Sequence, residues 1–322
     1  MKAAVIFQPG PPENFVAEER PTPKPGANQV LVAIKAFGLN RSELMTRKGF
    51  SPSVRFPRVL GIECVGEVME DPSGEFQKGQ QVAACMGEMG RAYDGSYAEY
   101  AVLPKSNLFS FSSTLPWEQL GAIPEMFHTV HGSLHSALQI KKGEILLIRG
   151  GTSSIGLLAV QVANNAGLTV IATTRNPKKK QLLFDNGATH VIIDDGAINE
   201  AVRKLFPEGV HRALELVGAT TLRDTLACVR PQGIACMTGM LSEQWSIKEF
   251  APMDYVPATV CLTTFDSGQL LSSKEAFQAF IKDVETGAVR LPVGKVFRLD
   301  QIIEAHQLME SNGAGGKIVV LP

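Results

Sequence analysis

The fold is decided by one stretch of sequence, Ile145-Leu146-Leu147-Ile148-Arg149-Gly150-Gly151-Thr152-Ser153-Ser154-Ile155-Gly156. It predicts an apolar strand at Glu144–Arg149, a turn rich in Gly and Ser, and then an apolar helix at Ser154–Ala166. Small residues in such a turn allow backbone N–H groups to approach a pyrophosphate at the positive end of the helix. We therefore expect a bound dinucleotide to contact Gly150, Gly151, Thr152, Ser153, Ser154, Ile155 and Gly156. The alternative is a tight strand–helix connection without a ligand.

Strands and helices alternate on the C-terminal side of this turn. Further strands are expected at Thr169–Thr173, His190–Ile193, Arg212–Val217 and Gly233–Thr238. The helices between them are expected at Pro177–Asn186, Ile198–Leu205 and Thr220–Val229. Short strands that alternate with helices of about ten residues form βαβ units around a parallel sheet. The middle of the chain is therefore expected to be an α/β domain of the Rossmann type, with a doubly wound parallel sheet.

The two ends of the chain have a different texture. The first ~115 residues predict short strands separated by Gly and Pro, at Ala3–Phe7, Gln29–Phe37, Val59–Met69 and Gln81–Ala84. The last segment predicts helices at Ser273–Thr286 and Leu299–Ser311, followed by a strand at Lys317–Leu321. One short strand with two helices makes a poor domain on its own, so we expect this segment to return to the β-rich first domain.

Composition bounds the possible functions. The chain has 322 residues, of which 44% are apolar and 20% are charged, with a net charge of −1. These values are ordinary for a soluble globular protein of about two domains, and they provide no bulk attraction to nucleic acid or anionic membrane. No apolar run reaches the ~18 residues of a membrane helix, and the apolar stretch of Met1–Pro9 is too short for a signal peptide. We therefore expect a cytoplasmic protein with no nucleic-acid or membrane partner, whose five scattered cysteines are reduced and mostly buried.

The end of the second strand indicates which dinucleotide binds. A site for NAD needs an acidic residue about 20 residues past the turn, whereas an Arg suits the 2′-phosphate of NADP. Here Thr174 and Arg175 occupy this place, and Lys178, Lys179 and Lys180 follow. A guanidinium can hold a phosphate with two hydrogen bonds, whereas a carboxylate repels it. We expect NADPH rather than NADH, bound in part by Thr174, Arg175 and Lys179, although the lysines also suit a solvated helix face.

Several motifs together resemble a known family along the whole chain. They are Lys2-Ala3-Ala4-Val5, the stretch 30–44 (VLVAIKAFGLNRSEL), the stretch 61–68 (GIECVGEV), Gly95-Ser96-Tyr97-Ala98-Glu99-Tyr100, the stretch from Thr129 to Gly156, and Gly316-Lys317-Ile318-Val319-Val320. The sequence is similar to the zinc-independent, quinone oxidoreductase-like branch of the medium-chain dehydrogenase/reductase superfamily. The resemblance implies a GroES-like (chaperonin-10-like) β-rich domain at residues 1–118 and 266–322, with a Rossmann domain at 119–265 between them. It also implies a dimer or a tetramer, and we expect a homodimer, since Thr259–Thr264 resembles the edge strand that joins sheets in family dimers.

The same resemblance argues against a metal. Zinc-dependent relatives have Cys where this chain has Asn40 and His where it has Ile62, and their third ligand falls near Glu125 or Met126. Isoleucine has no donor atom, and an amide is a poor zinc ligand. The four-cysteine structural zinc lobe has no counterpart, since Cys85 is the only cysteine between residues 80 and 110. We therefore expect no zinc.

The resemblance further implies a set of site residues. Thr129 would lie near the nicotinamide ribose, with Met240 and Lys317 as further cofactor contacts. The substrate pocket would include Asn40, Met45, Met126, Leu241 and Phe265. Asn40 could hydrogen-bond the carbonyl of the acceptor, but the spacing of Asn40 and Glu43 also suits a helix N-cap. Two departures bear on the cofactor: Ser153 replaces the middle glycine of the turn, and Asp194 takes the place of a tyrosine often found near the adenosine phosphate.

These features favour a metal-free reductase. NADPH can pass a hydride to an electron-poor small molecule such as a quinone or an α,β-unsaturated carbonyl. The tyrosine that donates a proton in enoyl-reducing relatives would fall near Met45 or Thr46, so water is the expected proton source. Alternatives are a zinc-type alcohol dehydrogenase, an enoyl reductase, and a non-enzymatic NADPH-binding regulatory protein. His128, His131 and His135 share the spacing of one helix face, which suits either a metal cluster or a plain solvated surface.

Overall fold

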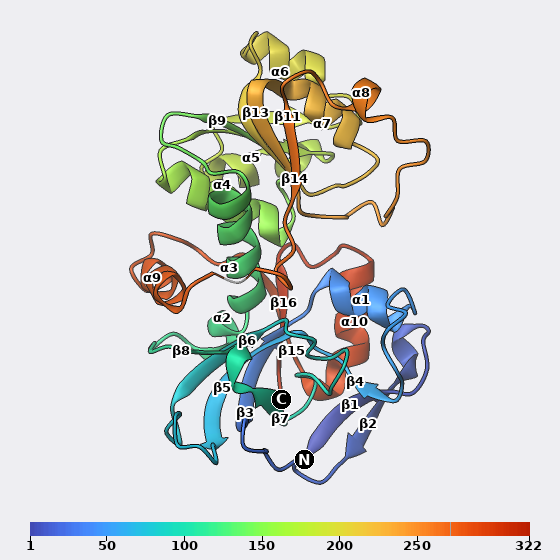
Figure 1. Ribbon diagram of the computed structural model, residues 1–322, viewed down its shortest axis with the longest axis vertical. Helices are drawn as coiled ribbons and strands as arrows, with labels where there is room; N and C mark the ends of the chain where they lie inside the picture. Colours follow the sequence, from blue (N-terminus) through green and yellow to red (C-terminus); the bar gives the residue numbers. More distant parts are fainter. Residues whose placement is uncertain (271) are drawn as a thin grey trace. The chain divides into compact units, whose positions relative to one another are not determined.

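In the computed structural model, which describes residues 1–270 and 272–322, strand β9 (Ile145–Arg149) leads through the Gly-rich turn into helix α4 (Ser154–Asn165) (Figure 1). This strand is central to a parallel sheet. Among the described residues the sheet has the strand order β11-β10-β9-β12-β13-β14. The other strands are β10 (Thr169–Thr174), β11 (His190–Ile193), β12 (Val210–Glu215), β13 (Val229–Met237) and β14 (Cys261–Thr264).

The order of these strands is that of a Rossmann fold. Every neighbouring pair in the sheet is parallel. From β9 the chain winds outward through β10 to β11, then crosses back to β12 and winds the other way. Strands β9 and β12 are therefore neighbours although two strands separate them in the sequence. At such a switch point, a crevice for a ligand opens beyond the carboxyl ends of the strands.

Helices cover both faces of this sheet. They are α4, α5 (Lys180–Asp185), α6 (Asn199–Leu205) and α7 (Leu222–Cys228), whereas the short α8 (Pro252–Tyr255) lies in the connection between β13 and β14 and buries no residue. Figure 1 shows α4 and α5 on one side of the strands and α6 and α7 on the other. The central strands are apolar on both faces and form the core, in which Leu147, Ile171, Ala213 and Ala235 are fully buried. The expected doubly wound sheet is confirmed.

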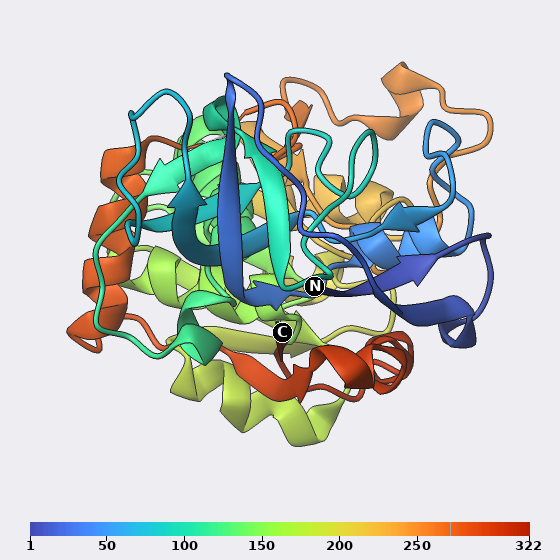
Figure 2. The ribbon, with the colours of Figure 1, turned by 90° about the horizontal axis from the view of Figure 1, so that it is seen from below.

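The chain divides into two units. This sheet belongs to the second unit, which contains His128–Leu271 and Ala288–Arg290. The first unit contains Met1–Phe127, Ser272–Gly287 and Leu291–Pro322, so both ends of the chain lie in it (Figure 2). The division falls inside helix α3 (Pro124–His131), which continues as a π-helical turn at Gly132–Ala137. The domain boundaries expected after residues 118 and 265 stay predictions.

Two sheets build the first unit. The larger has the order β15-β16-β3-β5-β6-β8, with β7 also paired to β3, and the smaller has the order β2-β1-β4. Strand β16 near the C-terminus pairs with β3 through Val319–Gly38 and Val320–Phe37, so the tail completes the N-terminal sheet. The strands are β1 (Lys2–Ile6), β2 (Phe15–Glu19), β3 (Gln29–Gly38), β4 (Arg58–Val59), β5 (Glu63–Glu70), β6 (Gln81–Cys85), β7 (Tyr100–Pro104), β8 (Leu108–Ser110), β15 (Val293–Arg298) and β16 (Lys317–Leu321). The helices are α1 (Arg41–Arg47), α2 (Trp117–Leu120), α9 (Lys274–Glu285) and α10 (Ile302–Glu310).

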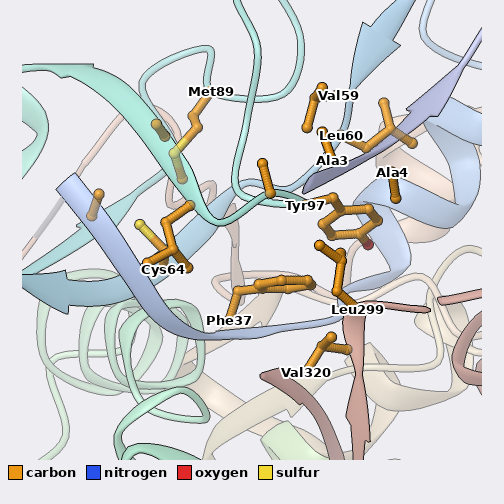
Figure 3. Close-up of a cluster of buried hydrophobic side chains, with 14 of the residues drawn as sticks. Ala3, Ala4, Phe37, Val59, Leu60, Cys64, Met89, Tyr97, Leu299 and Val320 are labelled. Carbon is orange, nitrogen blue, oxygen red and sulfur yellow. The ribbon is translucent and has the colours of Figure 1, made fainter. Parts of the chain in front are cut away.

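The core of the first unit joins side chains from both ends of the sequence. Ala3 and Ala4 lie in one buried cluster with Leu299 and Val320 (Figure 3). At its centre the rings of Phe37 and Tyr97 stack with 4.9 Å between centroids. This shared core is the physical reason why the tail returns to the first unit rather than forming a domain of its own.

Two general expectations can be compared with the structure. Four cysteines are buried, and the fifth, Cys261, is exposed on β14. Over residues 1–270 and 272–322, no helix combines the length and the apolar character that a membrane span requires.

Candidate functional site

The Gly-rich turn is held in place by hydrogen bonds to β10. The N–H of Gly150 donates to the Thr173 hydroxyl at 3.1 Å, and the N–H of Gly151 donates to the Thr173 carbonyl at 3.0 Å. Ser153 is the N-cap of α4, because its hydroxyl accepts from the Gly156 N–H at 3.0 Å and donates to the Gly150 carbonyl at 2.9 Å. The hydroxyl of Ser153 therefore closes the turn, and it is not left free to donate to a phosphate.

Two glycines allow the turn to lie against its surroundings. Gly150 has a φ of 84°, which L-residues with side chains rarely adopt. A Cβ atom on Gly156 would lie 2.5 Å from the Gly150 carbonyl oxygen, so the helix approaches the turn more closely than any larger residue allows. Closely packed N–H groups at a helix N-terminus fit the pyrophosphate of a dinucleotide.

The carboxyl end of β10 carries the residues expected near the 2′-phosphate. Thr174 is buried, and its hydroxyl accepts from the Asn176 N–H at 3.2 Å. Arg175 follows it and is exposed, and Lys179 is half-buried in the turn before α5. This strand end therefore offers a guanidinium and an ammonium and no carboxylate, which fits a phosphate better than a ribose hydroxyl.

Asp194 directly follows the neighbouring strand β11, and its carboxylate forms an ion pair with Arg149. Its two carboxylate oxygens accept from the Nε and Nη2 of Arg149, each at 2.8 Å. Burial would raise the pKa of Asp194, but the hydrogen bonds and charge of Arg149 hold it below its ordinary value. The negative charge that this position introduces is therefore balanced within the unit. We did not anticipate Arg149 as a site residue, although a charged residue that ends the apolar run Ile145–Ile148 was a visible signal.

The remaining predicted residues of the second unit lie at two places. Leu241 approaches the turn, since a Cβ on Gly150 would lie 3.3 Å from its Cδ1 atom. The ring of Phe265 covers Gly132 in the π-helical turn. Thr129 is almost buried on α3, and Met240 is half-buried beside Leu241. Their contacts with a cofactor or substrate stay predictions.

In the first unit, Asn40 and Lys317 belong to one buried polar cluster. The ammonium of Lys317 donates to the Asn40 side-chain oxygen at 2.5 Å and forms an ion pair of 2.7 Å with Glu63. The Asn40 amide nitrogen donates to Glu63 at 2.8 Å and to Glu43 at 3.3 Å. Burial would lower the pKa of Lys317, but the charges of Glu63, Glu125 and Glu43 and the bond to Glu63 raise it.

This cluster changes the interpretation of Asn40. Asn40 occupies the N-cap position of α1, as its spacing to Glu43 suggested, but its side chain makes no capping hydrogen bond. The side chain faces the ion pair instead, because a buried carboxylate and ammonium offer stronger hydrogen bonds than a backbone amide. Both amide protons face carboxylates, so a bond from Asn40 to a substrate carbonyl would have to replace one of these. That role, and a cofactor contact by Lys317, stay predictions.

Glu43 is the least satisfied member of the cluster. Its Oε1 accepts from the Ile62 N–H at 3.2 Å, whereas its buried Oε2 has no hydrogen-bond partner. Burial raises its pKa from 4.5 to about 7, although the charge of Lys317 opposes the shift. Glu63 was not predicted as a site residue, and Glu43 was predicted only as the capping partner of Asn40. The signal available was their place in motifs that resemble the family.

The residues at the position of the zinc site in relatives do not fit zinc. Ile62 offers no ligand atom, and the oxygen of Asn40 is engaged by the ammonium of Lys317. A cation already lies among the carboxylates, so a second, divalent cation would face its repulsion. Met126 is fully buried, and Met45 is half-buried. Within residues 1–270 and 272–322, no group of three His, Cys, Asp or Glu side chains is arranged to hold a metal ion.

The three histidines of α3 and the π-helical turn differ in environment. His128 is fully buried, and burial together with nearby His131 lowers its pKa to about 4. The rings of His131 and His135 lie 4.5 Å apart, and burial lowers the pKa of both. His128 therefore belongs to the core rather than to a solvated helix face.

Comparison with known proteins assigns both the N-terminal segment and the middle of the chain to one family. The chain matches the model "Alcohol dehydrogenase GroES-like domain" at residues 26–113 and the model "Zinc-binding dehydrogenase" at residues 154–285. It is 26% identical to the quinone oxidoreductase of Homo sapiens, over 100% of this chain and 98% of that protein. It is 27% identical to the 2-haloacrylate reductase of a Burkholderia species, over 99% of this chain and 98% of that protein. Among solved structures, mycobacterial Rv1454c complexed with NADPH superposes with a TM-score of 0.87 at 26% identity, covering all of both chains.

Proposed function

The chain belongs to the quinone oxidoreductase-like branch of the medium-chain dehydrogenase/reductase superfamily, and from this premise we propose its reaction. It is an NADPH-dependent oxidoreductase that works without a metal. It transfers a hydride to the electron-poor carbon or oxygen of a quinone or an α,β-unsaturated carbonyl compound. The observation that carries the proposal is the Gly-rich turn at the switch point of the sheet, with Arg175 at the carboxyl end of the next strand.

The residues of the turn support NADPH as the cofactor. Bound NADPH supplies the hydride, so the protein has to bind the dinucleotide, orient the acceptor and exclude water. The N–H groups at the start of α4 would hold the pyrophosphate, and Arg175 would hold the 2′-phosphate, with Lys179 nearby. The mycobacterial relative whose structure contains NADPH supports the same choice.

The residues at the expected proton-donor position, Met45 and Thr46, support an acceptor that needs no strong acid. Burial closes off the hydroxyl of Thr46, which is 2.8 Å from that of Ser51, and Met45 beside it has no acidic proton. Quinones and activated alkenes accept a hydride without prior protonation, and water can then supply the proton. Relatives named quinone oxidoreductase and 2-haloacrylate reductase support these two acceptor classes.

The test is NADPH oxidation by the purified protein with 1,4-naphthoquinone and, in parallel, with a simple enone. NADH is run beside NADPH, each with and without a metal chelator. We expect faster oxidation of NADPH than of NADH and no effect of the chelator. Equal rates with the two cofactors would contradict a preference for NADPH. Loss of activity with the chelator would contradict a metal-free reaction. Tight binding of NADPH without turnover on either acceptor would favour the non-enzymatic alternative.

Arg175→Ala provides the matched variant. Loss of a bidentate phosphate contact is expected to raise the KM for NADPH about tenfold or more while the kinetics with NADH change little. Lys180→Ala is the control, because Lys180 is also an exposed cation close to this strand end. An equal effect of the two variants would point to general electrostatic attraction instead of a specific contact.

A further inference from the structure

Arg149 is an unusual residue for its position. It ends strand β9, directly before the first glycine of the turn, and its side chain is fully buried. A buried guanidinium is tolerated only when its donors are paired. Besides Asp194, the Nη1 of Arg149 donates to Asp224 at 2.7 Å, and to the Thr221 carbonyl and the Thr225 hydroxyl, each at 3.1 Å.

Asp194 lies beside the strand end that would hold the 2′-phosphate. Its N–H donates to the Thr174 carbonyl at 2.9 Å, one residue before Arg175. Strands β10 and β11 are parallel neighbours, and Thr174 is in register with Ile193. Asp194 therefore follows β11 at the same edge of the sheet at which Arg175 follows β10.

One further hydrogen bond connects this carboxylate to the turn. The Thr173 hydroxyl donates to Asp194 at 3.2 Å and accepts from the Gly150 N–H at 3.1 Å. Arg149, Asp194, Thr173 and Gly150 thus form one network behind the place expected for the phosphates. Because Arg149 engages both oxygens of Asp194, the carboxylate faces the guanidinium and is only 8% exposed.

An unpaired carboxylate at this edge would act on the cofactor in a defined direction. It would repel the 2′-phosphate of NADPH. It would not repel the 2′-hydroxyl of NADH, because the carboxylate can accept a hydrogen bond from that hydroxyl. Neutralising this carboxylate therefore changes the choice between the cofactors more than it changes the affinity for both.

We propose that Arg149 is a positioning residue for cofactor specificity, which neutralises and turns away Asp194 so that the nucleotide unit can accept a 2′-phosphate. The inference rests on the proposed function, since it assumes that NADPH binds at the Gly-rich turn. It assigns a role in specificity to a residue that lies behind the turn and that need not touch the cofactor.

The test measures binding of two fragments that differ only in the 2′-phosphate. Titration calorimetry with adenosine 2′,5′-bisphosphate and with AMP gives the affinity ratio for wild type, Arg149→Gln, Asp194→Asn and the double variant. We expect the ratio to fall about tenfold in Arg149→Gln and to recover in the double variant, where position 194 no longer carries a charge. Asp224, the other carboxylate that Arg149 pairs, is present in both variants and therefore cancels in this comparison. Asp194→Asn is expected to keep or raise the preference for the bisphosphate, and it remains informative if Arg149→Gln does not fold.

A purely structural role for the network predicts a different result. Loosening of the turn would weaken both fragments by the same factor and leave the ratio unchanged, and this result in Arg149→Gln would overturn the inference. So would a lower ratio in Asp194→Asn. Asp195→Asn is the control, because Asp195 is exposed and makes no bond to Arg149. If Asp195→Asn raised the affinity ratio as much as Asp194→Asn does, the effect would come from the general charge of the loop. That result would contradict a specific role of the Arg149–Asp194 pair.

The failure of the proposed function is recognised separately. A wild-type protein that binds neither NADPH nor the bisphosphate overturns both statements. A wild-type protein that oxidises NADPH with a quinone, but whose ratio is the same in all variants, retains the proposed function and loses only the inference.

Discussion

Glu43 shows how a single buried carboxyl can control the stability of the first unit. It shares the cluster with Glu63, which forms the ion pair with Lys317, so the same ammonium has to serve two carboxyl groups. Its Oε2 atom has no hydrogen-bond partner, and a buried oxygen without a partner is better protonated than charged. Burial raises the pKa of Glu43 to about 7, so this carboxyl takes up a proton near neutral pH.

We predict that Glu43→Gln removes a pH dependence of stability. The folded chain binds this proton more tightly than the unfolded chain, since the pKa is about 7 instead of 4.5. The free energy of unfolding should therefore fall as the pH rises from about 4.5 through 7, by at most ~3 kcal/mol. Chemical denaturation at pH 5 and pH 8 should show that the free energy of unfolding of Glu43→Gln, relative to that of wild type, is higher at pH 8 than at pH 5. Glu70→Gln, on the exposed end of β5, is the control, and an identical pH profile for all three proteins would contradict the prediction.

Lys317 is expected to be a large contributor to stability only because Glu63 is present. Lys317→Met leaves the fully buried Glu63 without its cation, which should cost about 3–5 kcal/mol in urea denaturation. The double variant Lys317→Met/Glu63→Gln should recover most of this loss. Lys35→Met is the control, because the Lys35–Glu67 pair has a similar distance of 3.0 Å but side chains more than a third exposed, and solvated pairs contribute less than about 1 kcal/mol. Equal losses in Lys317→Met and Lys35→Met would disprove the argument.

At the scale of elements, the βαβ unit around the turn depends on close approach. A Cβ on Gly156 would also lie 2.7 Å from the Gly151 backbone, and backbone atoms cannot give way as a flexible side chain can. We predict that Gly156→Ala moves α4 away from the turn, costs about 1–3 kcal/mol of stability and weakens NADPH binding at least tenfold. Fluorescence titration with NADPH measures the second effect. Gly26→Ala is the control, since its Cβ would meet only the flexible side chain of Gln29, and unchanged NADPH binding in Gly156→Ala would contradict the prediction.

The elements around this turn were also the most predictable part of the fold. The periodicity placed β9, β10 and β11 within a residue of their observed bounds, because a buried parallel strand is a short apolar run between turn residues. Strands β2, β7, β8 and β15 were not predicted. Their residues alternate less clearly, and partners far away in the chain fix their pairing, as Val293 with Lys317 illustrates.

The side-chain partners of the site were harder to predict than its backbone. The ion pair of Lys317 and Glu63 joins residues separated by 254 positions, from 63 to 317, and no local pattern reports it. Likewise, Ser153 in place of glycine suggested a phosphate contact, but in the structure its hydroxyl caps α4 by accepting a hydrogen bond from the Gly156 N–H. Sequence spacing predicts which backbone groups are presented, whereas the hydrogen-bond partner of a hydroxyl or amide depends on the tertiary environment.

At the scale of the whole molecule, each unit has a core of its own, and the chain visits the first unit twice. The core of the first unit needs residues from both ends, such as Ala4 and Val320, whereas the core of the second is contained in one continuous run apart from a short segment. The second unit is therefore inserted into the first, and its sheet has two edges that the described part of the chain leaves with a single neighbour each, at β11 and β14.

The edge at β14 leads to our last prediction, a homodimer. Cys261 and Thr264 are exposed on this strand, and an exposed strand edge offers unpaired N–H and C=O groups to a second copy of the chain. A self-complementary edge closes with two-fold symmetry, so we expect light scattering to give twice the mass of the chain. Lysines on an edge strand oppose such pairing, and the variant Cys261→Lys/Thr264→Lys is expected to be monomeric with NADPH binding intact. Gln181→Lys, on exposed α5, should remain dimeric. A monomeric wild type at all concentrations, or a double-lysine variant that still dimerises, would show that this edge does not carry the assembly.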